Sequence, residues 1–157
     1  IIHQQLSGTA DQENAVHIIE TGPEPAKTLK GFLDSLNSKG VAVNLDPANL
    51  VMVVKDDPVQ AVHTLKDYIV HTHAKDGNNL CDCNPEVIYG VIDHDTIAYS
   101  RPFEEVPLGE GSVDFPSYLK ALDEIGYKGF LTIERECGDN PAADIERAAK
   151  FLENLIK

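Results

Sequence analysis

The sequence lacks the features that would place the protein in a membrane or on nucleic acid. No stretch has the roughly 20 consecutive apolar residues that a membrane-spanning helix needs, and we recognise no signal peptide at the start of the chain. Lysine and arginine number 13 against 26 aspartates and glutamates, which gives a formal net charge of −13. A chain this acidic repels phosphate backbones and anionic lipids, so we expect neither nucleic acid nor a membrane as a partner.

Cysteine is also scarce. The chain has 3 cysteines, Cys81, Cys83 and Cys137, so they cannot all pair with one another. Cys81 and Cys83 are too close in sequence for a comfortable disulfide, and they lack the second pair of ligands that would favour a metal site. We therefore expect loop thiols and a reducing, cytoplasmic location.

What the chain does contain is a repeated strand-helix pattern. Its 157 residues suit one globular domain with its own core. Brief apolar runs predict four strands, and apolar positions at helical spacing predict a helix after each one. The predicted strands are Val16–Glu20, Val41–Asp46, Tyr68–Gly77 and Gly129–Glu134, and the predicted helices are Pro25–Ser38, a helix from Pro58, Pro116–Ile125 and a helix from Pro141. This order predicts an α/β fold with parallel strands, either an open doubly wound sheet or part of a (β/α)8 barrel.

Between the third strand and its helix lies a long insertion, Gly77 to Gly111. It contains a β-like run, Val87–Tyr99, and we expect an elaborated loop or hairpin, which in a compact domain is often functional. Gly109-Glu110-Gly111 closes the insertion. These residues either cradle a phosphate or form a turn before the next helix, and the sequence does not separate the two interpretations.

Polar residues close all four predicted strands. At the two-residue period of a strand, Ile69, His71, His73 and Lys75 share one face of the third strand. Because the carboxyl ends of parallel strands meet at one edge, we expect Glu20, Asp46, His73 and Glu134 to converge there.

Three carboxylates and an imidazole in close company favour a divalent ion, since unpaired carboxylates repel one another. The donor set suits Mn²⁺, Mg²⁺ or Co²⁺, and Zn²⁺ also fits. The alternative is that unrelated acids simply cap the ends of strands.

Several segments also resemble a known family. The segments H-I-I-E-T-G-P-E-P, V-N-L-D-P-A-N-L, I-V-H-T-H-A-K-D-G, P-L-G-E-G-S-V-D-F and G-Y-K-G-F-L-T-I-E-R-E are similar to the sugar phosphate isomerase/epimerase family, the xylose isomerase-like TIM barrels. The resemblance implies that residues 1–157 form a single domain equivalent to the C-terminal half of a (β/α)8 TIM barrel, strands five to eight.

The resemblance also implies roles for individual residues. Glu20, Asp46, His73 and Glu134 would hold one divalent ion, and Glu20 and Glu134 would be the catalytic acid and base. Substrate contacts would come from His71, Lys75, Asn49 and Arg135. The implied reaction is isomerisation or epimerisation of a sugar or sugar phosphate, by proton transfer next to a carbonyl through an enediolate. An inosose-type dehydratase or a catalytically inactive half-barrel fragment are the alternatives.

The chain is short for this family, because it supplies only the last four strands. An unpaired half-barrel would expose two strand edges and an apolar inner surface. We therefore expect a homo-oligomer or a pairing with a missing half-barrel. The first four strands would be truncated, supplied by a second copy, or carried by another chain.

Overall fold

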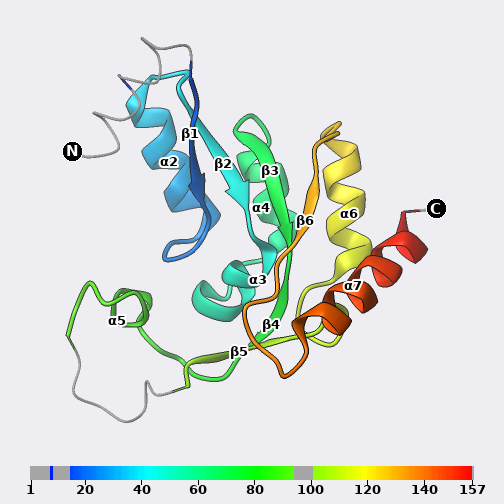
Figure 1. Cartoon of the computed structure of the whole chain (residues 1–157). Coiled ribbons are helices and arrows are strands. Elements are labelled where there is room, and N and C mark those ends of the chain that lie inside the picture. Colours follow the sequence, from blue (N-terminus) through cyan, green and yellow to red (C-terminus); the bar gives the residue numbers. More distant parts are fainter. Residues whose placement is uncertain (1–7, 9–14, 94–100, 157) are drawn as a thin grey trace.

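The computed structural model describes residues 8, 15–93 and 101–156 (Figure 1). Strands and helices alternate through most of this range. In chain order, the elements are β1 (His17–Glu20), α2 (Ala26–Leu36), β2 (Val41–Leu45), α3 (Pro47–Asn49), the π-helical turn η1 (Leu50–Val54), α4 (Pro58–Leu65), β3 (Ile69–Ala74), β4 (Asp76–Asn79), α5 (Pro85–Ile88), β5 (Phe103–Val106), α6 (Phe115–Glu124), β6 (Leu131–Ile133) and α7 (Pro141–Leu155).

Four of these strands form one parallel sheet in the order β1-β2-β3-β6. This confirms the predicted parallel α/β fold. Helix α4 contacts α2 and α6, and Figure 1 shows the helices standing along the sheet with α7 beside α6. Residues that alternate along β2, Val41, Val43 and Leu45, join side chains of these helices in one hydrophobic core. Burying one such aliphatic side chain contributes about 1.5–3 kcal/mol.

Helices α4, α6 and α7 begin where the sequence places a capping residue before a proline. Asp57 accepts a hydrogen bond from the backbone N–H of Val59 at the start of α4. Asp114 does the same for α6 and Asn140 for α7. Each cap stabilises its helix by about 1 kcal/mol, which explains why these helix starts are readable from the sequence.

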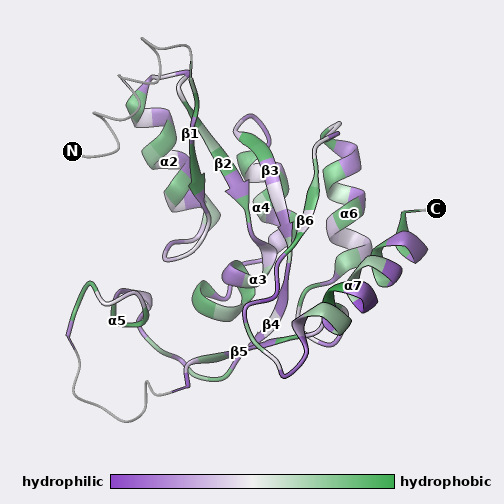
Figure 2. Ribbon diagram, viewed as in Figure 1, coloured by the Kyte–Doolittle hydropathy of each residue, from purple (hydrophilic) through white to green (hydrophobic). Residues whose placement is uncertain are grey.

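The face of the sheet away from the helices is open. Ile18 and Phe130 are 47% and 80% exposed, and neither belongs to the described core. Their strand neighbours Ile19 and Leu131 pack against that core instead, so alternation places Ile18 and Phe130 on the open face. Figure 2 shows hydrophobic stretches along β1, β2 and β6 that give way to hydrophilic residues toward β4.

The third strand departs from the predicted alternation at one point. Val43 pairs with Ile69, but the next residue, Asn44, pairs with His71, so β3 carries an extra residue there. Ile69 therefore packs against the helix-side core, while Val70 is half exposed. The predicted shared face holds for His71 and His73 and is wrong for Ile69, because a bulge reverses the alternation between them.

The insertion after β3 contains a two-stranded antiparallel sheet, β4 with β5, so the expected hairpin is confirmed. The predicted β-like run is wrong over its described part, because Val87 and Ile88 belong to helix α5. Asn84 caps that helix by accepting the N–H of Glu86, and Pro85 occupies its first turn. Residues 94–100 of the predicted run lie outside the described residues.

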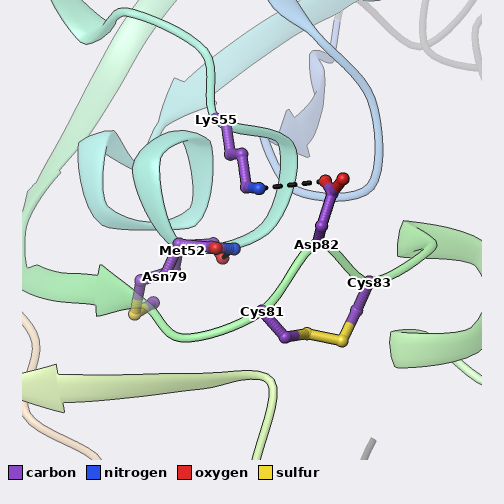
Figure 3. The surroundings of a disulfide bond; sticks show 6 residues. All are labelled: Met52, Lys55, Asn79, Cys81, Asp82 and Cys83. Carbon is purple, nitrogen blue, oxygen red and sulfur yellow. Dashed lines mark hydrogen bonds and ion pairs between the residues drawn. A yellow bond between two sulfur atoms is a disulfide. The ribbon is translucent and has the colours of Figure 1, made fainter. Parts of the chain in front are cut away.

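The two neighbouring cysteines form a disulfide, which corrects the prediction of loop thiols. The Cα atoms of Cys81 and Cys83 are 5.3 Å apart, inside the usual range for a bridge. Figure 3 shows the side chain of the intervening residue, Asp82, pointing away from the bridge toward the Lys55 ammonium, with which it forms an ion pair at 2.9 Å. Cys137 is a free, exposed thiol, and the cytoplasmic location stays a prediction.

Within residues 15–93 and 101–156, no helix is long and apolar enough to cross a membrane.

Candidate metal centre

Four side chains from four strands converge at the carboxyl edge of the parallel sheet. Glu20 ends β1, Asp46 follows β2, His73 lies near the end of β3 and Glu134 follows β6. One ligand atom from each lies within 4.8 Å of all the others. The His73 Nδ1 atom is 3.2 Å from Glu134, 3.4 Å from Asp46 and 3.6 Å from Glu20.

Local backbone geometry fixes the most buried of these acids. Asp46 is fully buried, and its Oδ1 atom accepts hydrogen bonds from the N–H groups of Ala48 and Asn49 at 2.8 and 3.0 Å. Asp46 is thus the N-cap of α3, and its second oxygen is left to face the cluster. The strand-end acid therefore has two uses, capping the next helix and presenting a lone pair inward.

Crowding changes the proton affinities in this cluster. The hydrogen bond with Asp46, helped by the charges of Glu134 and Glu20, raises the pKa of His73 despite its burial. Partial burial raises the pKa of Glu20, and the charges of Asp46 and Glu134 add to that rise. Both shifts arise because negative charges share a partly dehydrated space, which is the condition that a bound cation relieves.

Asn44 contacts the His73 ring on the side away from the three carboxylates. Its Nδ2 atom lies 3.0 Å from the Nε2 atom of His73, so the other ring nitrogen, Nδ1, faces the three carboxylates. The Oδ1 atom of Asn44 is buried and has no hydrogen-bond partner within the described residues. A hydrogen-bond partner on the far ring nitrogen fixes the orientation of the imidazole. The four side chains therefore suit a hard or borderline divalent ion in both donor type and orientation.

Lys75 is the cation that the chain itself supplies. It is buried, and its Nζ atom lies 2.6 Å from Glu136 and 3.0 Å from Glu134. Burial acts to lower the pKa of Lys75, but the Glu136 hydrogen bond and the Asp46 charge outweigh it, so the pKa is raised and the group stays charged. One ammonium offsets only part of the negative charge of the cluster.

The other residues predicted to contact a substrate take different positions. Asn49 donates to Glu20 and to the Thr21 carbonyl at 3.1 and 3.0 Å, so it borders the cluster. His71 pairs through Nε2 with the Thr132 hydroxyl and lies edge-on to His73. The Arg135 guanidinium is occupied by ion pairs with Glu105 and Asp144, which tie the end of β6 to β5 and α7.

Asp76 is a structurally important residue that the sequence pattern did not single out. Its buried carboxylate accepts four backbone N–H groups, those of Gly77, Gly109, Gly111 and Val113, at 2.9–3.1 Å. The N–H groups of the Gly109-Glu110-Gly111 turn therefore face a protein carboxylate. Of the two interpretations of this motif, the turn is correct and the phosphate cradle is not. The sequence pattern does not reveal this role, because Asp76 binds glycines some 35 residues away and the periodicity of a strand or helix does not register such a distant contact.

A cavity of about 350 Å³ adjoins the four converging side chains. One set of its lining residues is charged or polar: Glu20, Asn49, Lys75, Glu105, Glu134 and Glu136. The other set is apolar or aromatic: Met52, Val53, Ile88, Tyr89 and Phe103. Glu105 and Tyr89 come from the insertion, whose side-chain placement had no signal in the sequence.

Comparison with protein families matches residues 9–155 to the family described as Xylose isomerase-like TIM barrel. The chain belongs to this family, and the resemblance inferred from the sequence is confirmed.

Individual proteins are similar over part of their length. An inosose dehydratase from Clostridium botulinum is 26% identical over 90% of this chain. The L-ribulose-5-phosphate 3-epimerase UlaE from Salmonella paratyphi C is 42% identical over 32% of it. A crystal structure of a xylose isomerase domain protein from Planctomyces limnophilus superimposes on 98% of the chain with a TM-score of 0.76 and 30% identity. The matches span 47%, 18% and 49% of those proteins' own lengths, so this chain corresponds to less than half of each.

Proposed function

We propose that the chain carries the metal-binding half of the active site of a divalent-metal-dependent sugar isomerase or epimerase. The observation that carries the proposal is the convergence of Glu20, Asp46, His73 and Glu134 within 4.8 Å. We assign these four as the ligands of a single ion, Mn²⁺, Mg²⁺, Co²⁺ or Zn²⁺. When bound, the ion would polarise a substrate carbonyl and stabilise the negative charge that develops on its oxygen.

The chain's own residues would move the proton. Glu20 and Glu134 come from the two edge strands of the sheet, so they approach a substrate from opposite ends of the cluster. One glutamate would remove the proton next to the carbonyl, and the other would return a proton to the enediolate. Return to the neighbouring carbon gives isomerisation, and return to the opposite face of the same carbon gives epimerisation.

Lys75 and Asn49 would position these glutamates. Lys75 donates to Glu134 and Asn49 donates to Glu20, so each acid is held by one protein donor. His71 and Arg135 remain candidates for substrate contact, although the Nε and Nη1 atoms of Arg135 already donate to Asp144 and Glu105.

A dehydratase is the second candidate. The similarity to inosose dehydratase extends over 90% of this chain, whereas the similarity to the epimerase is confined to 32%. The same proton abstraction, followed by loss of a hydroxyl from the next carbon, would give that reaction. A fragment that binds metal without turnover is the third alternative.

Deuterium exchange separates these alternatives. The protein with added Mn²⁺ is incubated in D₂O with a panel of ketoses, ketose phosphates and inososes, and the substrate is followed by proton NMR. We expect loss of the C–H signal next to the carbonyl. Glu20→Gln and Glu134→Gln should slow exchange by about 100-fold or more, while Glu104→Gln, a glutamate of similar exposure outside the cluster, should not. A product lacking one water would favour the dehydratase, and exchange no faster than with Mn²⁺ alone would refute both.

We further propose that a second half-barrel covers the open face of the sheet. That face exposes Ile18, Val70 and Phe130, and β1 and β6 are edge strands. Exposed edges and apolar patches favour association. Light scattering on the chain should give a dimer or larger assembly, and Phe130→Lys should shift it toward monomer. A wild-type chain that stays monomeric at high concentration would refute this proposal.

A further inference from the structure

The cavity beside the four converging side chains has few free hydrogen-bond donors. Among its described lining residues, Lys75 donates to Glu134 and Glu136, and Asn49 donates to Glu20 and Thr21. The Tyr89 hydroxyl makes no hydrogen bond within the described part of the chain. The Lys75 ammonium also lies 3.9 Å from Asp46 and 4.0 Å from Glu105, so carboxylates surround it. Among the described lining residues, the Tyr89 hydroxyl is therefore the donor with no protein acceptor beside it.

Packing fixes the position of α5, whose C-cap residue is Tyr89. Ile88, next to it, and Phe103 pack against a small apolar cluster of Ala48, Met52 and Val53, which holds α5 near the carboxyl ends of the strands. On the far side, the Tyr89 hydroxyl lies against Gly22, where a Cβ atom would come within 2.6 Å of it. Gly22 thus leaves the space in which the phenol sits.

Charge around the cavity argues against an anionic ligand. Glu20, Glu105, Glu134 and Glu136 line it, and Asp46 lies directly behind. Lys75 and Arg135 are already paired with these acids. Even with a divalent ion bound, the carboxylates outweigh the positive charges, so a phosphate dianion would meet net repulsion.

The backbone N–H groups of Gly109 and Gly111 are not available to a phosphate. The glycine turn that could have cradled a phosphate donates to Asp76 instead. Sugar hydroxyls, in contrast, can donate to the carboxylates, and their oxygens need a donor such as the phenol. Burial raises the pKa of Tyr89 to about 12, so the phenol keeps its proton at neutral pH.

We propose that this cavity takes an uncharged polyhydroxy ketone in preference to its phosphate ester, and that the Tyr89 hydroxyl donates a hydrogen bond to a hydroxyl oxygen of that ligand. This inference rests on the proposed function, because it names the substrate class of the same site. Tyr89 is then a residue that contacts the substrate and sets specificity.

Calorimetric titration of the Mn²⁺-loaded protein with D-fructose and with D-fructose 6-phosphate tests the proposal, since the open-chain forms of the two ligands differ only in the phosphate. We expect D-fructose to bind at least tenfold more tightly. Tyr89→Phe removes one uncharged hydrogen bond and should weaken D-fructose binding about fivefold. Gly22→Ala, which displaces the phenol, should reproduce that loss. The affinity for Mn²⁺ should be the same in all variants.

Tyr68→Phe is the matched control, because the Tyr68 hydroxyl donates to Asp34 and Tyr68 packs against the helix-side core. It should bind D-fructose as the wild type does. Equal or tighter binding of the phosphate ester, unchanged binding by Tyr89→Phe, or no binding of either sugar would overturn the inference. Sugar binding that depends on Tyr89 without deuterium exchange would instead refute the proposed function alone.

Discussion

Replacing Asp76 by asparagine should destabilise the protein strongly although it changes one atom. The carboxylate Oδ1 atom accepts the N–H groups of Gly77 and Val113, and Oδ2 accepts those of Gly109 and Gly111. In the variant, an NH₂ group faces two of these donors, so two hydrogen bonds are lost. At about 1.5 kcal/mol for each bond to a charged acceptor, the loss is roughly 3 kcal/mol.

Urea unfolding followed by circular dichroism measures this loss. With a slope of about 2 kcal/mol per molar urea, the midpoint should fall by roughly 1.5 M. Asp82→Asn is the control, because that side chain is 99% exposed and forms only a surface pair with Lys55. The control should change the free energy of unfolding by less than about 0.5 kcal/mol. A loss below about 1 kcal/mol for Asp76→Asn would refute the assignment of Asp76 as the anchor of the glycine turn.

Three further predictions concern the core, the cluster and an exposed acid. Leu45 is fully buried in β2. Leu45→Ala should lower the free energy of unfolding by about 3 kcal/mol in the same urea assay, because the variant loses the burial of the leucine side chain and leaves a cavity in the core. Asn44→Leu removes the partner of the His73 Nε2 atom and should weaken Mn²⁺ binding about 10–100-fold in a calorimetric titration. Asn44→Asp, which places a carboxylate oxygen there that can accept the Nε2–H of a ligating imidazole, should not weaken it. Equal affinities in both variants would contradict the role of Asn44. The hydrogen bonds from Lys30 and Tyr68 hold the pKa of Asp34 below its ordinary value of 3.8. The contribution of Asp34 to stability is therefore present above pH 3.8 and is lost as the pH falls through the lowered pKa. Tyr68→Phe should move the pKa of Asp34 back toward 3.8 in an NMR titration.

The convergence at the strand ends was predictable because parallel strands share one carboxyl edge. Glu20, Asp46, His73 and Glu134 each lie near, at or just beyond the end of a strand at that edge, so the topology alone brings them together. The helix starts at Asp57, Asp114 and Asn140 were predictable for a similar reason, because a cap followed by proline is a local signal.

Features that depend on contacts between distant segments were not predictable. The bulge that turns Ile69 to the helix side is set by pairing with β2, and the two-residue period carries no sign of it. Asp76 acts through glycines more than 30 residues away. The sequence pattern predicts a strand at α5 because Val87 and Ile88 are β-branched, whereas the local cap at Asn84 and Pro85 decides their conformation.

Metal content measured by elemental analysis tests the central claim most directly. The chain is loaded with Mn²⁺, dialysed, and compared with Glu134→Ala and with Glu104→Ala, a glutamate of similar exposure outside the cluster. We expect about one ion per chain in the wild type and in Glu104→Ala, and almost none in Glu134→Ala. A wild-type chain that retains no metal after loading, or a Glu134→Ala variant that retains as much as the wild type, would contradict the claim that these four side chains form a metal site.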